Sequence, residues 1–400
     1  MNPFLAVLTA SCLARLSYQM ARSPVLPRFA ESLGAAPELI GIIVAASTVT
    51  GVLFKLPAGA LSDLLGRRRV MLLGAVFFAV PPFVYPFVND AVALLVLRFV
   101  HGFATAIFAP VASAYVAGLG EARRGARLGW FSSANDLGAT AGPLIGGLIL
   151  YATASFAASY LLVGVLGVLA LGMALLVPET ETKTTPAERS LSARAAEFRE
   201  GLRDVITTPA VLIAAAVEAT MYLGFGAFLG FLPLYARTVG LNDGAIAVVL
   251  AVQLTIALLA KPLTGNLSDR LGRKPVIVLG LFASAAALPL IFRMTSFAGL
   301  VTVVPLLGLG VAAVTPATNA LIADLVAARR LGAGMGVFGT IWDIGEAAGP
   351  MIAGFLIGDL GYATTFDVLA AVIALVSVGL MVLVRDPAAV ANRESERPAK

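Results

Sequence analysis

The sequence is short of charge, of cysteine and of histidine. Only 13% of its 400 residues are charged, 59% are hydrophobic, and the mean hydropathy is +0.93. So little polar surface cannot cover a water-soluble globule, and the composition therefore predicts an integral membrane protein. The single cysteine, Cys12, excludes a disulfide within the chain, and one histidine, His101, leaves little material for a zinc site.

The same shortages argue against an enzyme and against a nucleic-acid-binding protein. A membrane enzyme needs a nucleophile that converges with a base or a metal, and one histidine with one cysteine offers little for either. The basic pI of about 9.5 comes from residues in short loops, not from a basic face or helix. We expect no catalysis, no metal, no bound cofactor and no nucleic-acid partner.

What the chain does have is a series of apolar segments, each long enough to cross a bilayer. The first six are expected near 4–30, 38–59, 69–87, 92–118, 126–152 and 157–177, and the second six near 211–236, 244–264, 275–292, 298–325, 333–357 and 364–384. The first of these carries Arg15 and lacks a basic start, so we interpret it as a span and not as a cleaved signal.

The predicted fold class is an all-α membrane protein with twelve transmembrane helices in two pseudo-symmetric six-helix bundles. The first bundle is expected over residues 1–177 and the second over 210–385. Residues 178–209 are polar with alternating charge, which predicts a cytoplasmic linker with a surface helix, or else a plain linker. Residues 386–400 would form a cytoplasmic tail.

The distribution of basic residues predicts the orientation. Most of the 28 Lys and Arg lie in the loops that follow even-numbered spans and in the C-terminal tail, whereas the opposite loops hold only Arg28, Arg237 and Arg293. By the positive-inside rule, both termini are expected in the cytoplasm, in a multi-pass protein of the inner or plasma membrane.

One polar motif occurs twice, 206 residues apart. GALSDLLGRRR, from Gly59, returns as GNLSDRLGRKP, from Gly265, and the same offset relates LPRFAESLG to LPLYARTVG. Loops so rich in Gly, Asp and Arg are expected at a water interface. Two six-span halves repeated in parallel are a transporter architecture, with the central site at their interface and alternating access by rocking one half against the other.

These motifs resemble those of the major facilitator superfamily, over essentially the whole chain. The loop after span two fits the signature G-x-L-x-D-x-x-G-R-R/K at Gly59, Leu61, Asp63, Gly66, Arg67 and Arg68. Span four resembles the superfamily's R-x-x-x-G motif at Arg98 and Gly102. The resemblance implies the twelve-span fold and a transport function.

Span five is similar to the antiporter motif of twelve-span drug:proton exporters. The matching residues are Gly129, Gly138, Gly142, Pro143, Gly146 and Gly147, and span eleven has a degenerate copy at Gly336, Gly345, Gly349, Pro350 and Gly354. Small residues four apart let helix backbones approach closely, and a proline perturbs the helix, so both regions are expected to form hinges; ordinary helix packing is the alternative.

The resemblance also implies a conformational latch at the cytoplasmic surface, the alternative being plain anchoring charges. Asp63 would lie near the N-terminus of span eleven, where the helix dipole favours a carboxylate. Arg67 would meet an acid at the end of span four, for which Glu121 is available. The second latch would use Asp269, Arg273 and Asp324.

Polar residues inside the spans are the candidates for the substrate site. Helical spacing puts those of span one on one face and those of span four on another, and such faces must turn to water or to partners. The matching part of span seven is apolar and aromatic. The predicted substrate-binding residues are Arg15, Tyr18, Gln19, Arg22, Arg98, His101, Glu218, Met221, Tyr222 and Phe225. Alternatively, Arg98 pairs with a buried carboxylate and His101 is a packing residue.

Proton coupling requires a membrane-embedded acid, and the candidates are Asp136, Asp343, Glu346 and Glu218. Asp136 and Asp343 occupy matching places before the two motif prolines, and either could instead neutralise an arginine. The chain departs from many drug:proton exporters because no acid lies within spans one or four, the nearest being Glu31.

We therefore expect a proton-coupled exporter of small amphipathic organic molecules, which works by alternating access as a monomer and needs only the proton gradient. The three arginines within spans favour cargo with an acidic group. The alternatives are a lipid or glycolipid flippase of the same fold and an importer of an organic anion. A channel or a transport-dead sensor is disfavoured because the loop motif is intact in both halves.

Overall fold

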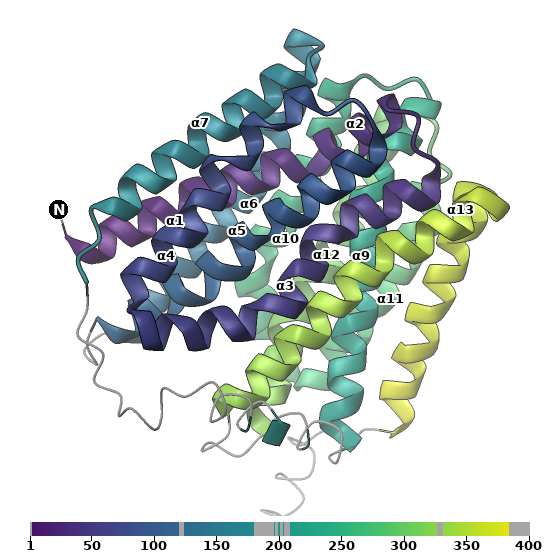
Figure 1. Cartoon of the computed structure of the whole chain (residues 1–400). Coiled ribbons are helices and arrows are strands. Elements are labelled where there is room, and N and C mark those ends of the chain that lie inside the picture. The colour runs from purple at the N-terminus through teal and green to yellow at the C-terminus, as the bar shows by residue number, and fades with distance from the viewer. Residues whose placement is uncertain are drawn as a thin grey trace, which may run out of the picture. The chain divides into compact units, whose positions relative to one another are not determined.

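The computed structural model describes the backbone of residues 2–119, 124–179, 209–325 and 331–383, together with Ala196, Arg199, Glu200 and Arg203. Within these residues every regular element is a helix (Figure 1). The predicted tail, and most of the predicted linker 178–209, fall outside them. The all-α fold class predicted from the sequence is confirmed.

The first half of the chain follows the six expected spans closely. Its elements are α1 (Pro3–Met20), the π-helical turn η1 (Ala21–Val25), α2 (Leu26–Ser32), α3 (Pro37–Leu65), α4 (Arg67–Ala79), the short 3-10 turns η2 (Pro81–Phe83) and η3 (Tyr85–Phe87), α5 (Ala91–Gly118), α6 (Arg124–Thr153) and α7 (Phe156–Leu175). Span one is thus interrupted at η1, where Ser23 adopts an extended conformation and Pro24 cannot donate to the helix ladder.

The second half contains α9 (Pro209–Thr238), α10 (Asp243–Leu271), α11 (Arg273–Ile291), α12 (Phe297–Leu325) and α13 (Leu331–Leu383). In the described part of the chain, ten helices are long and apolar enough to cross a membrane, so the expected count of twelve is not reproduced as such. Two features explain the difference. α6 holds expected span five but is not among the ten, and α13 carries spans eleven and twelve in one run that reverses direction at Gly361 (Figure 1).

The described residues form two compact units that cut across the sequence halves. Unit 1 takes in Met1–Ala196, Leu229–Ala251 and Pro350–Gly358, and unit 2 takes in Glu197–Phe228, Val252–Gly349 and Asp359–Lys400. Two polar contacts hold late segments within unit 1. The Ser23 hydroxyl donates to the Leu229 carbonyl at 3.1 Å, and the Arg28 guanidinium donates to the Asp243 carboxylate at 3.0 Å.

The apolar core of unit 1 lies between α1, α4, α5 and α7. Its largest side chains include Tyr18, Phe78, Phe108 and Tyr115, all almost fully buried. Phe78 meets both Tyr18 and Phe108 edge to face, with ring centroids 6.1 Å and 5.6 Å apart. Such contacts fix the rotation of α1 and α4 against α5, and this rotation places the polar residues of these helices.

The sequence repeat is also visible in the backbone. Gly66, after α3, and Gly272, after α10, have φ angles of 95° and 93°, and Gly34 and Gly240 have φ angles of 76° and 88°. Positive φ is strained for residues that carry a Cβ. The two halves therefore use glycine at matching positions to make matching sharp turns between helices.

Candidate functional site

A cavity of about 410 Å³ opens among four helices of unit 1. Its lining combines polar and aromatic side chains: Ser11, Ala14 and Arg15 from α1, Phe78 from α4, Thr105, Phe108, Ala109 and Ser113 from α5, and Leu128, Phe131, Ser132, Asn135 and Asp136 from α6. A concave site with apolar walls and a few polar groups is the usual form of a small-molecule site.

The cavity brings together Arg15 and Asp136, two of the residues predicted from the sequence. It also contains polar residues that the sequence analysis missed, of which Ser132 and Asn135 are the closest to Asp136 along α6. The signal for them was present, because positions 132, 135 and 136 have the spacing of one helix face. The cavity therefore offers a cation, an acid, an amide and hydroxyls beside three phenyl rings.

Of the predicted residues on span one, only Arg15 lines this cavity; the structure buries the other three. Tyr18 and Gln19 lie in α1 and are 3% and 8% exposed, and Arg22 lies in η1 and is 5% exposed. The α-helical period on which the expectation of one face rested ends at Met20, because η1 begins at Ala21. Arg22 therefore does not continue the face that Arg15 begins.

Tyr18, Arg98 and His101 form a second polar cluster, deeper in unit 1. The Arg98 guanidinium carbon lies 4.7 Å from the centre of the Tyr18 ring, a cation–π contact. The Tyr18 and His101 rings meet edge to face at 5.5 Å. Both Arg98 and His101 are fully buried, so the structure brings together the predicted residues of spans one and four.

Two tyrosines missed in the sequence analysis complete this cluster. Tyr85 from η3 hydrogen-bonds through its hydroxyl to His101 Nδ1 at 3.1 Å, and its ring stacks on that of Tyr160 from α7 at 4.0 Å. No local pattern revealed them, because Tyr85 sits in the proline-rich end of span three and Tyr160 in an otherwise apolar span. No carboxylate is paired with Arg98 among the described residues.

Glu218 is the most enclosed of the four acid candidates. It lies on α9 in unit 2, is fully buried, and neither carboxylate oxygen accepts a hydrogen bond of normal geometry. The Glu218 carboxylate interacts electrostatically with three polar groups, the Thr315 and Thr318 hydroxyls on α12 and the Lys261 ammonium on α10. Asp343 on α13 is 7% exposed, whereas Glu346 and Asp136 are half-buried.

The apolar and aromatic residues of span seven that were predicted to line the substrate site are buried on α9. Met221, Tyr222 and Phe225 are between 1% and 8% exposed. Tyr222 lies against Phe225 and against Trp342 of α13, with ring centroids 5.9 Å and 4.6 Å apart. Trp342 was not predicted from the sequence, although it precedes the candidate Asp343.

The antiporter-motif glycines of α6 lie against α1. A Cβ on Gly138 would be 2.7 Å from the Cys12 carbonyl oxygen, on Gly142 2.8 Å from the Met20 nitrogen, and on Gly146 2.7 Å from the Met20 carbonyl oxygen. Such distances leave no room for a side chain. α6 runs through Pro143 as one helix, so the predicted hinge is a region of very close helix contact.

The degenerate motif repeats this arrangement in the second half. In unit 2, a Cβ on Gly345 would collide with the Ala219 carbonyl oxygen of α9, and one on Gly349 with that of Leu223. Pro350 likewise lies inside a continuous stretch of α13. Both halves therefore place the fifth helix of the half against its first.

In the first loop motif, Arg67 donates to the Ala114 carbonyl at 2.8 Å. The Asp63 side chain and Glu121 lie outside the described part of the structure, so their predicted contacts stay predictions. A Cβ on Gly59 would meet nothing within 4 Å, whereas Gly66 has the positive φ described above.

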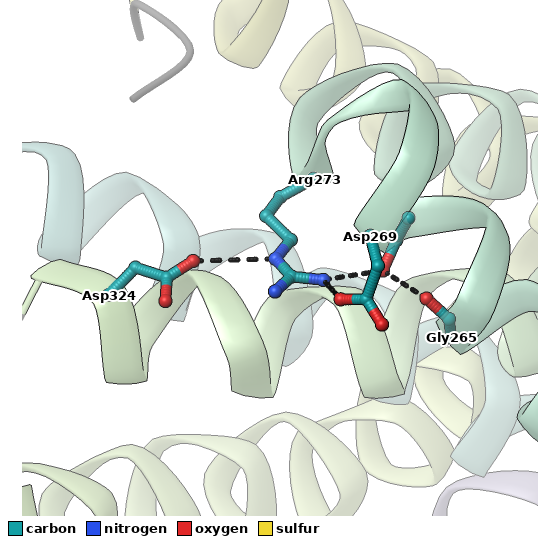
Figure 2. A network of polar contacts seen from close by, with 5 residues as sticks. Gly265, Asp269, Arg273 and Asp324 are labelled. Atoms are coloured by element: carbon teal, nitrogen blue, oxygen red, sulfur yellow. Dashed lines mark hydrogen bonds and ion pairs between the residues drawn. The ribbon is translucent and has the colours of Figure 1, made fainter. Parts of the chain in front are cut away.

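In the second loop motif, Arg273 joins two acids (Figure 2). Its guanidinium donates to Asp269, to Ser268 Oγ at 3.0 Å and to Asp324 at 3.3 Å. Arg273 thus contacts both acids of the predicted trio, Asp269 and Asp324, and both acids are exposed. In the repeat, the counterpart of Asp324 is Gly118, so the first half has no acid at this position.

The next basic residue of each motif caps the last helix of its half. Arg68 Nη2 donates to the Leu175 carbonyl at 3.0 Å, and Lys274 Nζ donates to the Met381 carbonyl at 2.7 Å. These are matching positions of the repeat, and a cation at a helix C-terminus is favoured by the helix dipole. The role of this pair was not foreseen from the sequence.

Comparison with known proteins identifies the protein family. The family model of the Major Facilitator Superfamily matches residues 7–252 and 214–400. The chain is 26% identical over 354 residues to an uncharacterized MFS-type transporter of Methanocaldococcus jannaschii, covering 86% of this chain and 88% of that protein. It is 25% identical over 365 residues to multidrug resistance protein 2 of Bacillus subtilis, covering 89% of both.

A solved structure shows the same fold. The nucleoside transporter NupG, in a D323A mutant, superposes with a TM-score of 0.81 at 13% identity, covering 96% of this chain and all of that one.

Proposed function

The chain belongs to the Major Facilitator Superfamily and is a multi-pass membrane transporter of small molecules, and from this premise we propose that it exports amphipathic organic molecules in exchange for protons. Alternating access would carry the cargo across, with both termini in the cytoplasm and the chain in the plasma membrane. The observation that carries this proposal is the cavity of unit 1.

The lining of that cavity suits amphipathic cargo. Phe78, Phe108 and Phe131 offer aromatic surface, and the polar groups of Asn135 and the hydroxyls offer a few directed hydrogen bonds. Arg15 and Asp136 both line it, so acidic and basic groups on a cargo each have an opposite charge available. The name of the Bacillus subtilis relative, a multidrug resistance protein, supports export over uptake.

For the coupling residue we propose Glu218. A buried carboxylate that lacks hydrogen bonds is costly to keep charged, so its charge is expected to change when the site opens to water. Asp343, Glu346 and Asp136 remain the other candidates. The Thr315 and Thr318 hydroxyls would stabilise either form, because a hydroxyl can both donate and accept.

The test is transport by purified protein in liposomes under an imposed pH gradient. A panel of matched anionic, neutral and cationic amphiphiles, with a labelled lipid beside them, would define the cargo, and Arg15→Ala and Asp136→Asn would test the cavity. We expect the wild-type protein to pump at least one amphiphile. The flux of that amphiphile should fall about tenfold in at least one of the two cavity variants. Flux of the lipid alone would contradict the export proposal and favour a flippase.

Glu218→Gln tests the coupling residue in the same liposomes. We expect it to abolish pH-driven flux while counterflow exchange continues, because binding and rocking do not require net proton movement. Asp359→Asn removes an exposed acid and is the matched control, with flux unchanged. Full pH-driven flux in Glu218→Gln would transfer the role to Asp136, Asp343 or Glu346.

A further inference from the structure

The cluster around Arg98 has donors without acceptors. Arg98 is fully buried, and none of its three guanidinium nitrogens makes a hydrogen bond of normal geometry. The Tyr160 hydroxyl and His101 Nε2 are likewise buried and without partners. Unpaired buried polar groups of this kind are uncommon in folded proteins, and each is costly.

Tyr85 does not remove this imbalance. Its hydroxyl is engaged with His101 Nδ1 at 3.1 Å, and although it also lies toward the Arg98 guanidinium, the geometry is too poor for a hydrogen bond to any of the three nitrogens. If the Tyr85 hydroxyl donates to Nδ1, then Nε2 carries the histidine proton and is one more donor.

The missing partner must therefore accept hydrogen bonds, and it must balance charge. Arg98 keeps its proton, since arginine is charged under all ordinary conditions, and no acid is paired with it among the described residues. The π face of Tyr18, 4.7 Å away, offsets only part of the cost of a buried cation. Water would accept the hydrogen bonds of these donors but would leave the positive charge of Arg98 uncompensated.

We infer that Arg98, His101 and Tyr160 bind one small monovalent anion inside unit 1. Chloride and the carboxylate group of an organic acid share the required chemistry, a single negative charge that accepts several hydrogen bonds. Tyr18 links this site to the cavity, because its ring contacts Arg98 and His101 and also Phe78, which lines the cavity. Movement of Tyr18 would give an anion access from the cavity.

The inference is tested by equilibrium dialysis of the purified full chain in lipid nanodiscs against radiolabelled chloride, with sulfate, a divalent anion without a carboxylate, keeping the ionic strength constant. We expect one saturable chloride per chain. Arg98→Gln should weaken binding about 10- to 100-fold, as expected for losing charge-assisted hydrogen bonds. Arg237→Gln, at an exposed arginine of α9, is the matched control and should bind as the wild type.

Tyr160→Phe separates an anion site from a merely structural cluster. It keeps the ring that stacks on Tyr85 and removes only the unpaired hydroxyl. In sulfate its thermal stability should equal or exceed that of the wild type, because an unsatisfied group is gone. In chloride it should gain less stability than the wild type and bind chloride about 5- to 10-fold more weakly.

Two further results decide the matter. Acetate or benzoate that displaces chloride would support the same site and identify a carboxylate, such as an acidic group on the cargo, as a source of the anion. If the wild type binds no chloride, acetate or benzoate beyond the level of Arg98→Gln, and chloride in place of sulfate shifts the melting temperature of both proteins equally, the inference is overturned and water is the partner.

Discussion

Two glycines of the first loop motif differ in what their positions require. Gly66 has a φ of 95°, which an L-residue adopts only with strain, whereas Gly59 lies inside α3, where a Cβ would meet nothing within 4 Å. Both fit the same motif in the sequence, so the motif by itself does not say which glycine the backbone needs. The structure assigns the requirement to Gly66.

We predict that Gly66→Ala lowers stability by about 1 kcal/mol or more, while Gly59→Ala is neutral or slightly stabilising. Thermal unfolding of the two purified variants in detergent, followed beside the wild type, measures this difference. Gly272→Ala in the second half should behave like Gly66→Ala, because its φ is 93°. Equal effects of Gly59→Ala and Gly66→Ala would contradict the assignment.

The acids of the latch can be compared at the same scale. Arg273 contacts both Asp269 and Asp324, so loss of one acid leaves the other, whereas the repeat gives the first half Gly118 in place of Asp324. We expect Asp269→Asn to keep most transport and Asp63→Asn to lose nearly all of it, with both proteins folded and inserted.

Transport in liposomes, with size-exclusion profiles to report folding, checks this pair. The double variant Asp269→Asn/Asp324→Asn is the control, because it removes both partners of Arg273 and should be as impaired as Asp63→Asn. Transport at the wild-type rate by Asp63→Asn would contradict the assignment of Asp63 to a conformational latch.

At the scale of helices, α6 and α1 approach too closely to admit side chains. Gly138→Ala, Gly142→Ala and Gly146→Ala would each put a Cβ within 3 Å of α1 backbone atoms, which cannot swing away as a flexible side chain can. We predict a loss of about 1–3 kcal/mol for each, the usual cost of overpacking. Gly129→Ala belongs to the same motif but meets nothing within 4 Å, and should be tolerated.

Folded yield and melting temperature of these four variants give the test. Gly345→Ala and Gly349→Ala extend it to the contact of α13 with α9 in unit 2, where similar losses are expected. If Gly142→Ala were as stable as Gly129→Ala, the close contact of α6 with α1 would be in error.

At the scale of the whole molecule, one ion pair joins residues far apart in the sequence. Arg28 of α2 and Asp243 of α10 are 3.0 Å apart and largely shielded from solvent, and Arg28 also contacts Glu31. A double-mutant cycle with Arg28→Gln and Asp243→Asn should give a coupling of about 1 kcal/mol, the upper part of the range for exposed pairs. A coupling near zero would show that the pair contributes nothing to unit 1.

Much of the fold was predictable from the sequence, because membrane spans can be recognised by their length and hydropathy. The repeat predicted matching loops between spans, and the structure adds that Gly66 and Gly272 make the turns there with positive φ. The interruption at η1 was not predicted, since the pattern of span one continues through it. Spans eleven and twelve were separated correctly, because the expected ranges 333–357 and 364–384 leave a gap that contains Gly361, the residue where α13 leaves the helical conformation.

The site was predictable only in part. Charged residues within spans stand out, so Arg15, Arg98, Asp136 and Glu218 were found. Tyr85 and Tyr160 were not, because a tyrosine in an apolar span looks like any core aromatic until the fold shows what its hydroxyl meets. Contacts between distant segments, such as that of Arg28 with Asp243, leave no periodic trace in the chain.

The make-up of unit 1 has a consequence for how the protein is made. Its last segment, Pro350–Gly358, contacts α3, because a Cβ on Gly41 would collide with the Pro350 carbonyl and one on Gly354 with that of Pro37. During synthesis the helices are inserted in chain order. The backbone at Gly41 therefore lacks its contact with Pro350 until nearly the whole chain has been inserted. A nascent chain stalled before Pro350 would expose the surface of α3 around Gly41 to the quality-control proteases of its membrane.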